Sequence, residues 1–201
     1  HNCLVGSEMC IRDSFYLVKV EAVRIGSSSP APLLTLIAGP SNEAKVAGKA
    51  KQEIVERHYI RKRWWTQLLS NSKAKSHQHI SPNMRAYICV SAGYRGLEFN
   101  YLVGQNNCGC ELYIDRGKDS QEENKMIFDK LQLQESTINQ KINFPISWQR
   151  LESKRASRIR IDLEGGYKSK EDDWGAFHEK MIDAMNELEA AVKPELKKLR
   201  L

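Results

Sequence analysis

The stretch Cys110–Ile142 constrains the fold more than any other part of the sequence, because its local patterns agree with one another. Glu111–Asp115 alternates as a half-buried strand does. After a polar turn, Ser120 and Glu123 have the spacing of a helix capping box. Apolar residues then recur at helical spacing, at Ile127, Leu131, Ile138 and Ile142. The pattern predicts one strand followed by one long amphipathic helix that packs on a sheet.

Four further strands are predicted around this pair. Ala86–Ser91 and Leu97–Val103 alternate and flank a glycine-containing turn, which is typical of a β-hairpin. Ile146–Leu151 and Ser157–Leu163 alternate in the same way and are joined by a short polar turn. Strands that follow one another through short turns pair as antiparallel hairpins. An antiparallel sheet is therefore expected.

Two more helices complete the predicted domain. One carries an apolar stripe at Ile60, Trp64 and Leu68. The other begins with a capping box at Ser169 and Asp172, and Pro194 is expected to kink or restart it. Its apolar face is formed by Trp174, Phe177, Met181, Met185, Leu188 and Val192. Residues 43–201 therefore predict an α+β domain, an antiparallel sheet covered by about three helices.

The segment before this domain predicts two strands, Phe15–Ile25 and Leu33–Ile37, separated by a loop rich in serine and proline. Two strands alone cannot bury a core. We therefore expect residues 15–42 to be the end of a sheet that belongs to another, upstream domain.

The first residues are expected not to be native. Cys3–Ser14 reads CLVGSEMCIRDS, which resembles the translation of a transposase adaptor used in sequencing libraries along its whole length. Residues 1–14 are therefore left out of the fold prediction. Three of the five cysteines then remain: Cys89, Cys108 and Cys110.

Size and composition limit the class of protein. A chain of 201 residues with 41% hydrophobic residues can form one ordinary core. No apolar run approaches the roughly 18 residues of a membrane span, and no signal peptide is recognisable. The cysteines are odd in number and unevenly spread, which indicates reduced thiols. We expect a cytoplasmic protein without a membrane partner.

Positive charge is concentrated in residues 45–80, which hold nine lysines and arginines against Glu53 and Glu56. This excess of +7 equals the net charge of residues 15–201, while the whole chain carries +6. The segment is either the solvated face of an amphipathic helix or a surface that contacts phosphates. In the second interpretation, the nucleic-acid-binding residues are Arg57, Arg61, Lys62 and Arg63, with Trp65 stacking on a base and Arg155, Arg158 and Arg160 as a second patch.

A rival interpretation comes from another class of protein. The apolar face Trp174–Val192 of the final helix could serve as a protein-interaction or dimerisation surface, which would make the chain a homo-oligomer. Nucleic acid remains the leading partner, because the charge is concentrated in one segment.

Catalytic and metal patterns are weak. Asp115 with Glu152 and Lys154 fits the loose pattern of metal-dependent nucleases, but Glu-x-Lys is a common tripeptide and is expected here at a turn. His77 with His79, and Cys108 with Cys110, each give two ligand types without the rest of a site. We expect no active site, no metal and no cofactor in this chain.

Two groups of motifs carry a family resemblance. The first group is Val20–Gly26 with Pro30-Ala31-Pro32. The second group comprises Trp64-Trp65, Leu68-Leu69, Glu111–Asp115, Glu123–Lys125, Phe128-Asp129, Ser147-Trp148, Arg158–Arg160 and Asp173-Trp174. From Tyr16 onward the chain resembles a bacterial family of uncharacterised proteins with an N-terminal restriction-endonuclease-like domain and a C-terminal domain of unknown function.

The resemblance implies how the chain relates to a longer parent. Residues 15–42 would close the nuclease-like domain, whose metal-binding carboxylates would lie upstream of Phe15. The parent would then be a candidate metal-dependent nuclease, and residues 43–201 its accessory module. The resemblance implies no activity and no functional residue for that module, so the nucleic-acid expectation rests on the charge pattern.

Overall fold

The computed structural model describes residues 17–38 and 42–199, and the chain divides into two compact units, residues 1–56 and 57–201. The first unit contains two strands, β1 (Leu17–Val23) and β2 (Ala31–Ala38). Helix α1 (Asn42–Ser70) begins in the first unit and ends in the second. Residues 1–14, where the adaptor resemblance lies, are outside the described residues.

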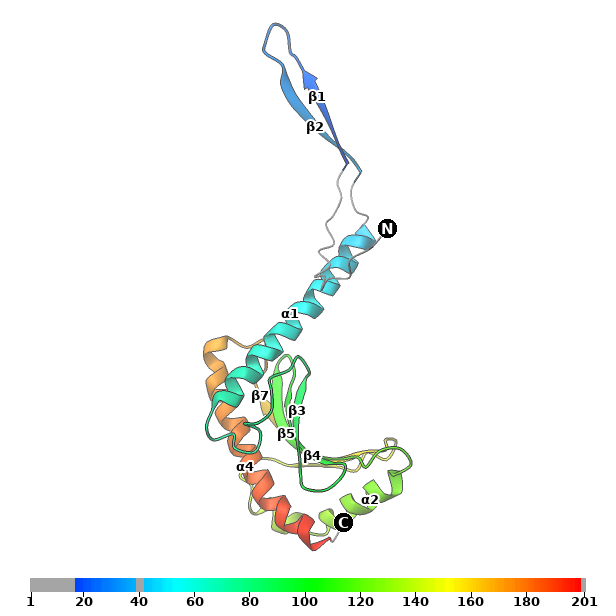
Figure 1. Ribbon diagram of the computed structural model, residues 1–201, viewed down its shortest axis with the longest axis vertical. Helices are drawn as coiled ribbons and strands as arrows, with labels where there is room; N and C mark the ends of the chain where they lie inside the picture. The colour runs from blue at the N-terminus through cyan, green and yellow to red at the C-terminus, as the bar shows by residue number, and fades with distance from the viewer. Residues whose placement is uncertain (1–16, 39–41, 200–201) are drawn as a thin grey trace, which may run out of the picture. The chain divides into compact units, whose positions relative to one another are not determined.

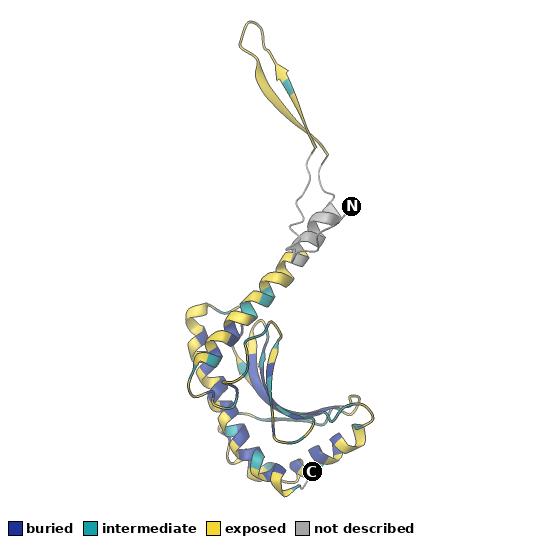
Figure 2. Ribbon diagram, in the orientation of Figure 1, coloured by how far each residue is buried: buried dark blue, intermediate teal, exposed yellow. Residues whose placement is uncertain are grey.

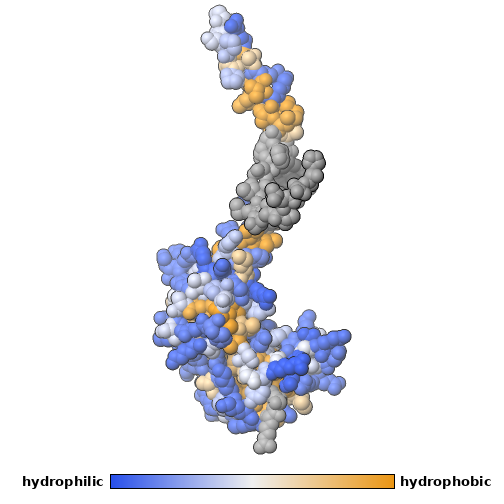
Figure 3. All heavy atoms as spheres, viewed as in Figure 1, coloured by the Kyte–Doolittle hydropathy of each residue, from blue (hydrophilic) through white to orange (hydrophobic). Residues whose placement is uncertain are grey.

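The strands β1 and β2 form an antiparallel hairpin, which confirms the two predicted strands. Its large apolar side chains lie at the surface, as Figure 3 shows. Leu34 is 67% exposed and Val20 is 66% exposed, so the hairpin buries no core of its own. The assignment of this segment to an upstream nuclease-like domain stays a prediction.

The second unit contains a five-stranded sheet, in which all neighbours are antiparallel (Figure 1). Its strands run in the order β3-β4-β5-β7-β6. Their bounds are β3 Tyr87–Ser91, β4 Leu97–Val103, β5 Asn107–Ile114, β6 Ser147–Gln149 and β7 Ser157–Glu164. The predicted α+β class with an antiparallel sheet is confirmed.

Three helices follow α1 in this unit: α2 (Gln121–Gln132), α3 (Glu135–Asn139) and α4 (Trp174–Lys198), with the short 3-10 helix η1 (Glu171–Asp173) before α4. Helices α2 and α4 contact the sheet from one side (Figure 1). The face they cover is buried (Figure 2) and centres on Leu112 of β5, which pairs with Phe99 of β4 and Ile159 of β7. None of the described helices has the length and apolar character that crossing a membrane requires.

The predicted central helix is wrong in its length and in its cap. The chain leaves the helix after Gln132 and begins α3 at Glu135, with Leu133 82% exposed between them. Ser120 makes no capping bond from its side chain. The apolar stripe has a gap between Leu131 and Ile138, so a continuous helix would bury no apolar side chain in that turn. The break into two short helices still brings Ile138 into the core.

The final helix differs from its prediction at both ends. It begins at Trp174, and the Ser169 hydroxyl accepts a hydrogen bond from the Gly166 N–H instead of capping the helix. Pro194 lies inside α4, which continues to Lys198 without a restart. The apolar face is confirmed, since Met181, Met185, Leu188 and Val192 are fully buried.

Gly109 is required where β5 lies beside β7. A Cβ atom at this position would lie 2.2 Å from the backbone oxygen of Ile161, and a backbone oxygen in a paired strand cannot move aside. We expect Gly109→Ala to lower the free energy of unfolding by about 1–3 kcal/mol, measured by urea denaturation. Gly175→Ala in α4 is the matched control, because its Cβ meets nothing within 4 Å and alanine favours a helix. Equal stability of the two variants would contradict the expectation.

Candidate nucleic-acid interface

The second half of α1 presents cations to the surface because its apolar side packs into the core. Trp64, Trp65 and Leu68 are fully buried, and Ile60 packs against the same core. This confirms the predicted stripe Ile60, Trp64 and Leu68. Lys62 and Arg63 lie outside this stripe and are exposed, whereas Arg57 and Arg61 lie on the same side of the helix as Trp64 and are half-buried.

Three of these cations form what we call the basic stripe: Arg57, Arg61 and Lys62. Arg57 and Arg61 are half-buried and one helical turn apart, and the Nε atom of each is buried without a hydrogen-bond acceptor in the described part of the chain. No carboxylate pairs with any of the three among the residues whose side chains the structure describes. The Arg61 guanidinium lies 5.2 Å from the ring centre of Tyr167, which holds it in place.

Two members of the predicted basic segment do not belong to the stripe. Arg63 forms an ion pair with Glu171, which compensates its charge. Trp65 is fully buried, and its Nε1 donates a hydrogen bond of 2.9 Å to the Arg85 carbonyl. The prediction that Trp65 stacks on a base is wrong, because tryptophan at this position is a core residue of the helix–sheet interface.

Arg155 of the predicted second patch is held by a carboxylate. Its guanidinium donates two hydrogen bonds to Asp115, of 2.7 and 2.6 Å. The hydrogen bonds from Arg155 lower the pKa of Asp115 below its ordinary value. This bidentate pair joins the end of β5 to the loop before β7 and compensates the charge of Arg155.

Arg158 and Arg160 lie on the face of β7 opposite the helices, at alternate positions. The Nε of Arg158 donates to Gln149, and the Nε of Arg160 donates to Asp162, each over 2.7 Å. Both guanidinium groups also approach the Glu111 carboxylate, with Nη1–Oε2 distances of 3.5 and 3.9 Å. The structure therefore brings these two arginines together but supplies carboxylates beside them.

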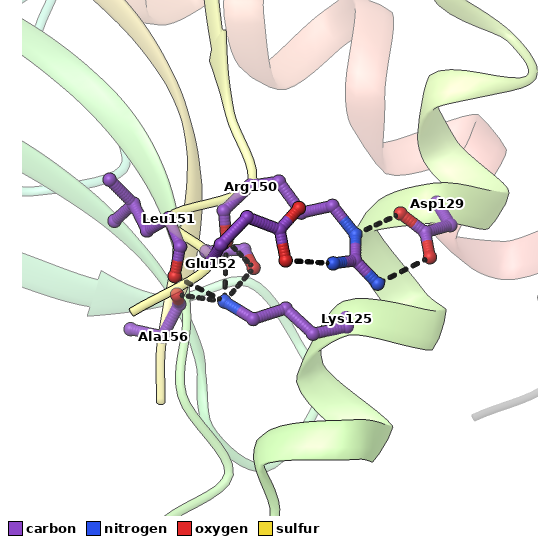
Figure 4. A network of polar contacts seen from close by, with 7 residues as sticks. Lys125, Asp129, Arg150, Leu151, Glu152 and Ala156 are labelled. Carbon is purple, nitrogen blue, oxygen red and sulfur yellow. Dashed lines mark hydrogen bonds and ion pairs between the residues drawn. The ribbon is translucent and has the colours of Figure 1, made fainter. Parts of the chain in front are cut away.

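A network of polar contacts is centred on the buried Lys125 of α2 (Figure 4). Its ammonium donates to the carbonyl oxygens of Arg150, Leu151 and Ala156 and to the Ser157 hydroxyl. Burial lowers the pKa of Lys125, but four oxygens around one ammonium favour its charged form. The network closes the loop between β6 and β7, in which Leu151 has a φ of +56°.

A surface groove of about 930 Å³ lies beside this network, along α2. Arg150 lines it and donates two hydrogen bonds to Asp129, of 2.8 and 3.1 Å, and it also pairs with Glu152 (Figure 4). Exposed apolar side chains, Met126 and Leu133, also line the groove. Arg150, Asp129 and Glu152 are thus bonded to one another on this wall.

The carboxylates of the predicted nuclease pattern, Asp115 and Glu152, form ion pairs with two different arginines. Asp115 is held by Arg155, and Glu152 is held by Arg150 at an exposed turn. Among the described residues, no three histidine, cysteine or carboxylate side chains are placed to hold a metal ion together. The geometry therefore offers no argument for joining Asp115, Glu152 and Lys154 in one site.

Three of the weaker metal candidates, His77, Cys108 and Cys110, lie in the core, whereas His79 is exposed. His77 is fully buried, with Nε2 3.0 Å from the Phe99 carbonyl and Nδ1 2.9 Å from the Ser76 hydroxyl. Cys108 and Cys110 are buried on the helix-covered face of β5, and burial raises the pKa of both thiols, that of Cys108 to about 12. Both cysteines therefore stay protonated and pack as small apolar residues.

The apolar face of α4, on which the rival interpretation depends, is buried. The face Trp174–Val192 of α4 packs on the sheet and on α1, where the Trp174 and Trp64 ring centres lie 5.0 Å apart. It is therefore part of the core of its own domain. The protein-interaction or dimerisation role of the final helix stays a prediction, without this buried face as its surface.

Sequence reasoning missed Lys125 and Glu111. A signal for Lys125 exists, because it precedes the buried Phe128 by three positions and so lies near the apolar face of its helix. Glu111 offers less of a signal, since a polar residue at alternate strand positions is expected to be exposed, whereas Glu111 is 4% exposed.

Comparison with known proteins assigns the second unit to a family. No curated protein and no solved structure matches the chain. One family model matches residues 60–196, a range that begins within α1, includes the whole five-stranded sheet and ends within α4. The chain belongs to the family described as Domain of unknown function (DUF4268).

Proposed function

We propose that this chain is an accessory module that binds nucleic acid through phosphate contacts on the basic stripe. The observation that carries the proposal is that no carboxylate pairs with Arg57, Arg61 or Lys62 among the side chains that the structure describes. Lys62 lies beside the two arginines on the same helix and is exposed. Phosphate oxygens supply the negative charge that these unpaired cations lack in the described part of the chain.

The packing of α1 makes the stripe a fixed surface. Trp64 contacts Trp174 and His178 of α4 edge to face, with ring centres 5.0 and 4.4 Å away. Cations on a rigid helix lose less conformational freedom on binding than cations on a mobile tail. The second patch supports the proposal less strongly, because carboxylates compensate its arginines.

The proposal gives this module a holding role for a larger nuclease-like bacterial protein. The family resemblance supports such a parent, and the separate engagement of Asp115 and Glu152 supports a role without catalysis. The chain would increase the time that the parent spends on its nucleic acid.

Removal of the basic stripe tests the proposal directly. The variant Arg57→Gln/Arg61→Gln/Lys62→Gln of the full chain should bind labelled DNA at least about tenfold more weakly at low salt, measured by fluorescence anisotropy. Each lost phosphate contact reduces the slope of log affinity against log salt by about 0.9 on duplex DNA. The triple variant should therefore lose about two to three units of this slope.

The control variant is Lys118→Gln/Lys141→Gln/Lys154→Gln, which removes the same charge from exposed positions elsewhere. It should change the affinity only slightly. Equal losses in both triple variants would mean that overall charge, not the stripe, causes binding. Absence of binding by the unmodified chain at low salt would overturn the proposal.

A further inference from the structure

The sheet has a second face, opposite α2 and α4, with a different composition. Pairing register places alternate residues of β3, β4, β5 and β7 on it. We call it the polar face and define it by Tyr87, Asn100, Glu111, Tyr113, Arg158 and Arg160. Asn100, Glu111 and Arg160 are direct cross-strand neighbours in one row, and Tyr113 and Arg158 are neighbours in the next row.

The two central polar residues of this face are buried and incompletely bonded. Asn100 is 5% exposed and Glu111 is 4% exposed. The Asn100 amide donates a 3.2 Å hydrogen bond to Oε1 of Glu111, while Oδ1 of Asn100 and Oε2 of Glu111 have no hydrogen-bond partner in the described chain. Oε2 of Glu111 lies 3.5 and 3.9 Å from Nη1 of Arg158 and Arg160, so the two arginines compensate its charge.

The arginines of the polar face are held in place by neighbouring side chains. The Nε atoms of Arg158 and Arg160 are anchored by Gln149 and Asp162, and the Glu111 carboxylate lies between the two Nη1 atoms. The side chains are 28% and 17% exposed, so part of each group reaches solvent. Fixed guanidinium groups donate hydrogen bonds to bases and stack on them.

Aromatic side chains lie on the same face at different rows. Tyr87 is 38% exposed and Tyr113 is half-buried. The row of Tyr87 crosses β5 at Gly109. Tyr113 lies four positions further along the same strand. At about 3.4 Å per residue the rows are about 14 Å apart, which is room for more than one stacked base.

The basic stripe approaches the sheet at the turn between β4 and β5. The Arg61 guanidinium lies over Tyr167, whose N–H donates to the Gly104 carbonyl over 3.1 Å, and Lys168 N–H donates to Gln105 over 2.9 Å. The stripe therefore adjoins the turn between β4 and β5. Among the rows that hold Tyr87, Glu111 and Tyr113, the row of Tyr87 is the nearest to that turn.

We propose that the polar face binds the bases of a single-stranded nucleic acid whose phosphates are held by the basic stripe. This inference rests on the proposed function and narrows it to single strands. In a duplex the bases are stacked and paired, so their faces cannot reach Tyr87 and Tyr113. Bases stack on the tyrosines, while Arg158 and Arg160 donate to base acceptors.

The experiment compares a single-stranded oligonucleotide of about 12 nucleotides with the duplex of the same sequence, by fluorescence anisotropy with the full chain. The unmodified chain should prefer the single strand. The variant Tyr87→Leu/Tyr113→Leu should bind the single strand at least about tenfold more weakly, because two stacking contacts are lost, and should bind the duplex unchanged.

Two controls keep the result interpretable. Tyr87→Phe/Tyr113→Phe retains both rings and should keep the single-strand affinity, even if the leucine variant folds poorly. Tyr94→Leu removes a tyrosine from the turn between β3 and β4, outside the polar face, and should leave binding unchanged. Circular dichroism checks that each variant is folded.

The outcomes separate the two proposals. If the chain binds both forms equally, the tyrosine variants have no effect and the stripe variant weakens binding, this inference is overturned while the proposed function stands. If the unmodified chain binds neither form at low salt, the proposed function fails and takes this inference with it. A selective loss of single-strand affinity in the leucine variant, restored by phenylalanine, supports the inference.

Discussion

Replacing Lys125 by methionine should lower the free energy of unfolding by about 3–5 kcal/mol, although the two side chains are similar in length and volume. Lys125 is 6% exposed and donates to three carbonyl oxygens and one hydroxyl. Methionine fills the space but donates nothing, so the buried Ala156 carbonyl and the part-buried Leu151 carbonyl lose this donor. The Arg150 carbonyl keeps its hydrogen bond from the Ser157 hydroxyl. Each buried acceptor without a partner costs about 1–3 kcal/mol.

The position of the network increases the expected effect. Lys125 holds the loop between β6 and β7, where Leu151 adopts a left-handed φ of +56° that an L-residue rarely adopts without support. Without the ammonium, the loop is free to leave this conformation. Loss of the loop would also weaken the pairing of β6 with β7, since β6 is only three residues long.

Urea denaturation of the full chain measures this effect, with Lys130→Met as the control. Lys130 lies on the exposed side of the same helix, so the control should change stability by no more than about 0.5 kcal/mol. If Lys125→Met is as stable as Lys130→Met, the oxygens around Lys125 are satisfied in another way, and its structural role is refuted.

Acidification should destabilise the second unit at a pH where most carboxylates are still ionised. Burial lowers the pKa of His77 to about 4 and that of His178 to about 4, from 6.5 for an exposed histidine. Nδ1 and Nε2 of His178 have no hydrogen-bond partner in the described chain, and its ring centre lies 4.4 Å from that of Trp64. A proton on His178 would place a charge among aromatic rings.

The direction of the pH effect on stability follows from the number of protons that the folded and unfolded chains bind. With a folded pKa of about 4 and an unfolded value of 6.5, the unfolded chain binds more protons between these values, so stability rises with pH across this window. The contribution is complete above pH 6.5 and is lost as the pH falls toward 4. Between about pH 7 and about pH 5 the loss should be roughly 2 kcal/mol for each histidine.

Carboxylate effects fall in a lower window. The hydrogen bonds from Arg155 lower the pKa of Asp115 from 3.8, so its contribution is lost only at more acidic pH. The variant His77→Gln/His178→Leu should therefore show a nearly flat stability between about pH 7 and about pH 5, measured by urea denaturation. His79→Gln, at an exposed position, is the control and should keep the full pH dependence. An unchanged slope in the double variant would contradict the assignment to His77 and His178.

The strands and the final helix were predictable because their signals are local. Alternation in Ala86–Ser91 and Leu97–Val103 predicted the hairpin of β3 and β4, and the apolar face from Met181 to Val192 predicted the buried side of α4. The stripe Ile60, Trp64 and Leu68 predicted which side of α1 is buried. In each case, the period of the apolar residues is the geometry of the element itself.

Other features were not predictable, because they depend on partners distant in sequence. Trp65 follows Trp64 directly and looked exposed, yet it is buried beside Arg85. The second basic patch looked like free charge, yet Asp115 pairs with Arg155 from 40 positions away. Lys125 likewise finds its acceptors more than 20 positions away along the chain.

By itself, then, the sequence determined the α+β class, the antiparallel hairpins, the buried stripes and the location of the excess positive charge. Only the tertiary structure decided which of those cations have carboxylate partners. It also decided that the face of α4 belongs to the core and that Glu111 is buried between two arginines. The physical reason is that periodicity fixes which side of an element is apolar, whereas charge compensation and burial depend on which elements the fold brings within a few ångströms.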